Sequence, residues 1–190
     1  MFNIDQSQRR WVLLGLICLM AATRFHHFGS LATLPDASLA VFFLAGLYLA
    51  HARVLALLLI EAALIDFLAV EVGGVSDWCV TPGYALLFPG YGVMWLSGLL
   101  CRRFNRLTAS AAMLIGGMLT GAASLAFLLS NAGFFGFSGY FPEMSWSEYA
   151  GRVAKYYPAY LSSTLIYAGL VCAGAYAVAL RTAGTVPKNA

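Results

Sequence analysis

Long apolar runs separated by short polar segments dominate this chain of 190 residues. A helix needs about 20 predominantly apolar residues to cross the ~30 Å hydrocarbon core of a bilayer, and most of these runs come close to that length. Hydrophobic residues make up 61% of the sequence and charged residues only 10%, whereas roughly a quarter of a soluble domain is charged. The runs also lack the alternation of apolar and polar residues that is typical of membrane β-barrel strands. The sequence therefore predicts an all-α membrane protein.

We expect six transmembrane helices in a single transmembrane domain that covers residues 1–190. Their approximate bounds are 11–28, 37–50, 54–72, 84–100, 107–131 and 157–180. The second run is short, and we expect its helix to extend into the flanking residues. Arg9 and Arg10 precede the first run as in a signal peptide, but no small-x-small cleavage site follows. We therefore interpret that run as a retained helix.

The basic residues are distributed unevenly between the two predicted sides of the membrane. Cytoplasmic loops carry an excess of Lys and Arg. A cytoplasmic N-terminus assigns eight basic residues to the inner side and three to the outer side, namely Arg24, Arg152 and Lys155. We therefore expect both the N- and C-termini to be cytoplasmic. The net charge of +3 comes without a basic tail, so no nucleic-acid partner is predicted.

A lone cysteine stands out in the third loop, which this orientation puts on the outer side. Cys79 lies between the turn formers Gly73-Gly74 and Pro82-Gly83. The four cysteines of the chain show no C-x-x-C spacing, so neither a disulfide framework nor a zinc site is indicated. Cys79 has no partner cysteine on its side of the membrane. A thiol in an oxidising compartment then suggests a nucleophile, an intermolecular disulfide or a ligand of a soft metal.

Two acidic residues interrupt the third apolar run. Asp66 lies twelve residues after Val54, about 18 Å along a helix, and so beyond the membrane midplane towards the outer side. Because an ionised carboxylate in a membrane is costly, it usually faces a partner or a polar cavity; we expect Arg152 or Cys79 beside it. Glu61 lies about 140° around the same helix, and we interpret it as a structural residue.

The fifth loop, residues 131–148, is rich in glycine and aromatic residues. Either an aromatic belt at the lipid headgroups or a lid over a large flat ligand accounts for this composition. Ser145 and Glu148 fit a capping box, which predicts a helix that starts at Trp146. Pro158 is expected to interrupt or kink that helix before the last span. Arg152 lies four residues after Glu148, so a surface ion pair is the alternative to a role in a site.

This pattern resembles the substrate-binding S-components of energy-coupling-factor (ECF) vitamin transporters. More specifically, the whole chain looks like the BtuM family, proposed cobalamin transporters of Gram-negative bacteria. The residues that carry the resemblance are Asp66, the segment Asp-Trp-Cys79-Val-Thr-Pro-Gly-Tyr84, and Arg152. The resemblance implies an S-component-like bundle that crosses the bacterial inner membrane several times and takes up cobalamin. It also implies that Cys79 binds the cobalt and that Asp66, Tyr84 and Arg152 surround the corrin.

The resemblance leaves some functional questions open. The first span lacks the Ala-x-x-x-Ala pair on which many S-components dock, so a partner ECF module is not implied. A thiolate on cobalt should loosen a cyanide on the opposite face, and we hypothesise that Cys79 removes cyanide from cyanocobalamin. An S-component for another vitamin remains an alternative, as does a structural membrane subunit. A membrane thiol or redox enzyme is a further alternative, although such enzymes usually need a second, resolving cysteine.

Overall fold

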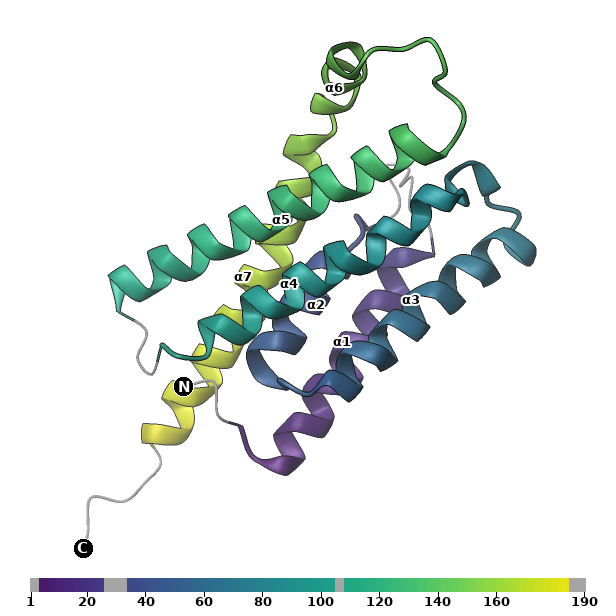
Figure 1. Cartoon of the computed structure of the whole chain (residues 1–190). Coiled ribbons are helices and arrows are strands. Elements are labelled where there is room, and N and C mark those ends of the chain that lie inside the picture. The colour runs from purple at the N-terminus through teal and green to yellow at the C-terminus, as the bar shows by residue number, and fades with distance from the viewer. Residues whose placement is uncertain (1–3, 26–33, 105–107, 185–190) are drawn as a thin grey trace, which may run out of the picture.

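The computed structural model describes residues 4–25, 34–104 and 108–184, with side chains described through residue 178. Every element in these ranges is helical, and the helices pack into one bundle (Figure 1). The elements are α1 (Gln6–Arg24), α2 (Ser38–Tyr48), α3 (Ala52–Glu71), η1 (Asp77–Cys79), η2 (Pro82–Leu86), α4 (Leu87–Cys101), α5 (Ala109–Phe137), α6 (Trp146–Ala154) and α7 (Tyr157–Gly184). The short helices η1 and η2 are 3-10 helices. The all-α prediction is therefore confirmed for the described residues.

Three helical segments are long and apolar enough to cross a membrane, namely Pro82–Cys101, Ala109–Phe137 and Tyr157–Val178. They correspond to the last three predicted spans. Their length and composition support a membrane protein. The first three predicted spans correspond to α1, α2 and α3, of which α2 differs most from its prediction.

Helix α2 is shorter than the predicted span and does not extend into its flanks. Ala50 has a φ of 56°, and its N–H donates to the carbonyl oxygen of Ala45 at 3.0 Å, which is typical of a left-handed helix stop. Eleven residues span only about 16 Å, roughly half of a hydrocarbon core. All eleven are buried. The expectation of an extended second span is therefore wrong, and α2 is a central core helix.

Local capping explains most other differences at the helix ends. Helix α1 begins five residues before the predicted span because Asp5 and Gln8 form a capping box, with N–H to oxygen distances of 2.8 and 3.0 Å. The end of that span, 26–28, lies outside the described residues. Helix α5 continues to Phe137, six residues beyond its prediction. The loop that follows it is correspondingly shorter.

The predicted helix at Trp146 is confirmed. The Ser145 hydroxyl oxygen accepts from the Glu148 N–H at 3.3 Å, and the Ser145 N–H donates to a Glu148 carboxylate oxygen at 2.8 Å. Helix α6 ends at Ala154, and Pro158 lies in the first turn of α7. Proline is tolerated there because the first helical N–H groups have no intrahelical acceptor. The expected interruption before the last helix is thus also confirmed.

Helices α2 and α4 pack with their backbones in contact. A Cβ atom added to Gly46 would overlap the carbonyl oxygen of Trp95, and one added to Gly98 would overlap that of Phe43. Small residues allow such an approach between helices in lipid. These two glycines therefore set the separation of α2 and α4, and hence the position of the side chains that the two helices contribute to the site.

We expect Gly46→Ala to lower the free energy of unfolding by about 1–3 kcal/mol, because the added methyl group forces the two backbones apart. The measurement is thermal or denaturant unfolding of the purified protein in detergent. Gly92→Ala in α4 is the matched control, since a Cβ there meets no atom within 4 Å. The free energy of unfolding of this control should rise by about 0.5–1 kcal/mol, because alanine favours a helix more than glycine does. Equal behaviour of the two variants would contradict the packing described here.

Candidate functional site

A cavity of about 350 Å³ opens at the end of the bundle where α3 leads into η1. Its walls come from helices far apart in the sequence. The polar residues that line it are Arg24, Asp36, Asp66, Ser76, Cys79, Tyr84, Tyr91, Ser130, Asn131 and Tyr160. The cavity thus brings together Asp66, Cys79 and Tyr84, three of the four residues predicted for the site.

The floor of the cavity is an ion pair between α1 and α3. The Arg24 Nε donates to Oδ1 of Asp66 at 2.8 Å, and its Nη2 donates to Oδ2 at 2.6 Å. The Arg24 side chain is only 1% exposed, and Asp66 is 8% exposed. Planar two-point pairing of this kind is the strongest arrangement open to a guanidinium and a carboxylate.

The rest of the guanidinium is also bound. Its Nη1 donates to the Ser38 hydroxyl at 2.8 Å and to the Tyr91 hydroxyl at 2.6 Å, and lies 3.5 Å from Oδ2 of Asp36. One cation therefore joins α1 to the start of α2, to α3 and to α4. Because every donor nitrogen has an acceptor, the buried charge of Arg24 is compensated.

Asp66 also binds the wall of the cavity above it. The Tyr84 hydroxyl donates to Oδ2 of Asp66 at 2.6 Å, which links η2 to the floor. The prediction of Cys79 or Arg152 beside Asp66 is met only in part, because Cys79 lines the same cavity but the ion-pair partner is Arg24. One sequence feature does indicate this pair. Arg24 is a basic residue at the end of the first apolar run, and a cation buried in a membrane usually pairs with an acidic side chain.

Cys79 lies at the rim of the cavity, at the end of η1. The Ser76 hydroxyl caps this turn by accepting from the Trp78 N–H at 3.2 Å, and the Val80 N–H donates to the Asp77 carbonyl at 2.7 Å. Burial raises the pKa of the Cys79 thiol, and the negative charge of Asp66 raises it further. The Cys79 thiol is therefore protonated at neutral pH.

This raised pKa predicts slow alkylation of Cys79. Only the thiolate reacts, so the rate with iodoacetamide at neutral pH should be several-fold lower than in a free peptide of residues 76–82. The difference between the two alkylation rates should disappear as the pH rises above the pKa of Cys79 in the folded protein. The thiolate is then the main form in both the protein and the peptide. Mass spectrometry of the alkylated peptide measures both rates. Identical pH profiles would show that the fold does not raise the pKa.

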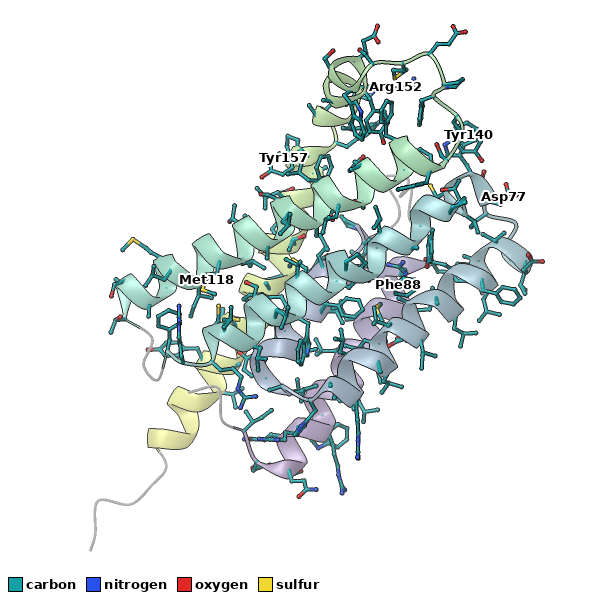
Figure 2. The ribbon with its side chains drawn as sticks, in the orientation of Figure 1. Asp77, Phe88, Met118, Tyr140, Arg152 and Tyr157 are labelled. Carbon is teal, nitrogen blue, oxygen red and sulfur yellow. The ribbon has the colours of Figure 1, made fainter. Side chains whose placement is uncertain are left out.

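Arg152 does not line the cavity. Its guanidinium carbon lies 5.9 Å from the centre of the Phe141 ring, a cation–π contact. Figure 2 shows Arg152 and Tyr140 at the same end of the molecule as Asp77. Burial raises the pKa of Tyr149, and the nearby charge of Arg152 lowers it. Arg152 is thus near the rim of the site but separated from Asp66.

A cluster of aromatic rings, here called the aromatic cluster, lies beside the cavity and joins η1 to the segment between α5 and α6. Its members are Trp78, Phe134, Phe135, Tyr140, Phe141, Trp146 and Tyr149. Trp78 stacks on Tyr140, with ring centres 3.8 Å apart and planes 9° from parallel. Phe134 packs against both rings and also lines the cavity. The cluster therefore borders the opening, which is the position a lid would require.

The site combines a soft sulfur, a polar floor and apolar walls. Within the described residues no group of three or more His, Cys, Asp or Glu side chains could hold a metal ion. The Cys79 thiol can supply one ligand, so a metal bound here would bring its other ligands with it. Asp66 and Tyr84 can in turn hydrogen-bond to the polar edge of such a complex.

A comparison with protein-family models finds no match for this chain, and a comparison with curated proteins finds no significant relative.

Proposed function

We propose that this chain binds a corrinoid, such as cobalamin, in the cavity beside Cys79 and takes it up across the bacterial inner membrane. The observation that carries the proposal is the position of Cys79, a solitary thiol at the rim of a cavity with Asp66 and Tyr84 on its inner surface. These are three of the four residues that the BtuM resemblance assigns to the corrin and its cobalt; the fourth, Arg152, does not line the cavity.

The chemistry of the site fits a metal held in a macrocycle. A corrin supplies the four equatorial ligands of cobalt, so the protein needs to contribute only one axial donor. Thiolate is a soft ligand suited to a polarizable transition metal. The apolar faces and edges of the ring would contact walls that are mostly apolar, and the aromatic cluster would cover the outer face. A corrinoid is larger than the cavity of about 350 Å³, so the Trp78–Tyr140 stack opens on binding.

Binding is linked to the protonation of Cys79. Because the pKa of the Cys79 thiol is raised, the thiol gives up its proton only when the positive charge of the cobalt compensates the thiolate. One proton is then released for each corrinoid bound. Arg24 favours this step because it neutralises much of the nearby charge of Asp66.

Removal of cyanide is a ligand exchange within the same proposal. The Cys79 thiolate donates an electron pair to cobalt, and cyanide leaves the opposite face with the pair of its own bond. Cobalt keeps its oxidation state, so no external reductant is needed. The thiolate is consumed in the new bond, and each chain therefore releases one cyanide unless other thiols regenerate it.

The membrane arrangement belongs to the proposal as well. In this arrangement the chain crosses the membrane six times with both termini in the cytoplasm, and α2 is a short crossing enclosed by its neighbours. The cavity then lies on the outer side, where the vitamin arrives. Arg9 and Arg53 lie near the starts of α1 and α3, whereas Cys79 follows the end of α3. This distribution agrees with basic residues on the inner side. The acidic side chains of Glu61 and Asp66 lower the apolar character of α3, and Asp66 is compensated by Arg24.

Retention of a corrinoid tests the proposal directly. Protein expressed and purified with cobalamin should be pink or orange and carry one corrinoid per chain in its visible absorption spectrum. A strain that depends on external cobalamin should grow when it expresses the protein. Retention of a flavin or thiamine without any cobalt compound would favour an S-component for another vitamin and overturn the corrinoid assignment.

A further inference from the structure

The carboxylate oxygens of a second acidic side chain in α3 are buried and have no hydrogen-bond partner among the described residues. Glu61 lies five residues before Asp66, about 7.5 Å along the helix axis and on the side away from the cavity. Both carboxylate oxygens of Glu61 are buried, and neither accepts a hydrogen bond from any part of the chain that the structure describes. Glu61 thus differs from Asp66, whose oxygens accept from Arg24 and Tyr84.

A second unpaired polar atom lies at a similar depth on the neighbouring helix. The indole Nε1 of Trp95 in α4 is buried and has no acceptor among the described residues. Trp95 lies one turn after Tyr91, and α4 runs opposite to α3 (Figure 1). Glu61 and Trp95 therefore lie about one turn below the two side chains that bind Arg24. At this depth of the bundle, the carboxylate of Glu61 and the indole N–H of Trp95 are both buried, and neither makes a hydrogen bond to a described residue. Such groups are rare in folded proteins.

The surroundings of Glu61 favour a neutral carboxyl group. An ionised carboxylate buried without a donor is strongly destabilising, and binding a proton removes that cost. Helix α1 carries Arg9 and Arg10 near its start and Arg24 at its end, and α3 itself carries Arg53, Asp66 and Glu71. The titratable groups of α2 and α4 are Tyr48, Tyr91 and Cys101. Helix α2 contributes no charged side chain. Arg24 is the cation beside this part of α3, because its Nε donates at 3.3 Å to the carbonyl oxygen of Ala62, the residue after Glu61. Its guanidinium is also engaged with Asp66.

We propose that Glu61 is a proton-binding site and that Arg24 couples its occupancy to the floor of the cavity. Glu61 holds a proton while Asp66 neutralises Arg24. When Asp66 loses its charge, the field of Arg24 stabilises the Glu61 carboxylate, and the proton passes to water. Changes at the floor of the cavity are then linked to a proton in the membrane core, whatever cargo the cavity binds.

Infrared spectroscopy of the full-length protein in lipid nanodiscs tests the site without any ligand. The C=O stretching band of a protonated carboxyl group should be present at neutral pH, shift in D₂O, and be missing in Glu61→Gln. Glu71→Gln is the matched control, because Glu71 lies exposed at the end of the same helix and its replacement should leave the band intact. A band that persists unchanged in Glu61→Gln would overturn the proposal.

The coupling has its own test at the same pH. Asp66→Asn removes the main counter-charge of Arg24, so the intensity of the Glu61 band should fall to half or less. Asp36→Asn removes the more distant carboxylate partner of Arg24, at 3.5 Å, and keeps the buried Arg24–Asp66 pair. The intensity of the Glu61 band should therefore fall less than in Asp66→Asn. Unchanged intensity in both variants would refute coupling through Arg24. Because no corrinoid is added, these results stand apart from those on vitamin binding.

Discussion

Purified Cys79→Ala protein mixed with cyanocobalamin should give the absorption spectrum of the intact cyano form, whereas the wild-type spectrum should shift. The thiol at the cavity rim is the one soft donor among the lining residues. Its replacement removes the axial bond and with it the electron donation that labilises cyanide. We also expect the affinity for the corrinoid to fall by at least about tenfold, equivalent to ~1.4 kcal/mol.

A second cysteine provides the control for this experiment. Cys18 is exposed on α1 and does not line the cavity, so Cys18→Ala should keep both the shifted spectrum and the release of cyanide. Free cyanide, measured after removal of the protein, should reach at most one equivalent per wild-type chain when no other thiol is present. Identical spectra for wild type and Cys79→Ala, both of the cyano form, would end the proposal that sulfur binds the cobalt.

Replacement of Arg24 should have the largest effect on stability. Arg24→Met leaves Asp66 buried without its cation and also removes the donors to Ser38 and Tyr91. Breaking a buried ion pair from one side costs about 3–5 kcal/mol. The free energy of unfolding in detergent, from denaturant or thermal melts, should fall by that amount.

Two further variants show whether the loss of stability comes from breaking the Arg24–Asp66 pair or simply from removing an arginine. Arg53→Met removes an exposed arginine at the start of α3 and should change stability by no more than about 0.5 kcal/mol. The double variant Arg24→Met/Asp66→Leu should be more stable than Arg24→Met, because the buried, unpaired carboxylate at position 66 is removed as well. A loss below about 1 kcal/mol in Arg24→Met would mean that the pair does not hold α1 to α3.

The interpretation of Arg24 illustrates the limit of reasoning from the sequence. In the sequence this residue is a basic side chain at the end of an apolar run, a position that indicates the orientation of the helices but identifies no partner. Its partner Asp66 is 42 residues away, and whether the two meet depends on the rotation and depth of two helices. For Arg152 the sequence predicts a place beside Asp66, but the structure shows its guanidinium over the ring of Phe141 instead.

The sequence by itself determined the features that depend on neighbouring residues. Apolar runs without alternation predicted helices, the Ser145–Glu148 capping box predicted the start of α6, and Pro158 predicted the break before α7. The short spacing from Cys79 to Tyr84 also brought these two residues into one loop region. Each of these depends on backbone geometry and hydrogen bonds within a few residues, so little outside the segment can alter it.

Only the tertiary structure decided how these segments meet. The contact of α2 and α4 at Gly46 and Gly98 fixes the distance between the two helices. It makes α2 a buried core helix although its composition resembles that of a span. The packing of α1 against α3 lets Arg24 reach Asp66. Glu61 lies deeper and has no hydrogen-bond partner among the described residues. Such pairings depend on the close packing of whole helices, which no local pattern specifies.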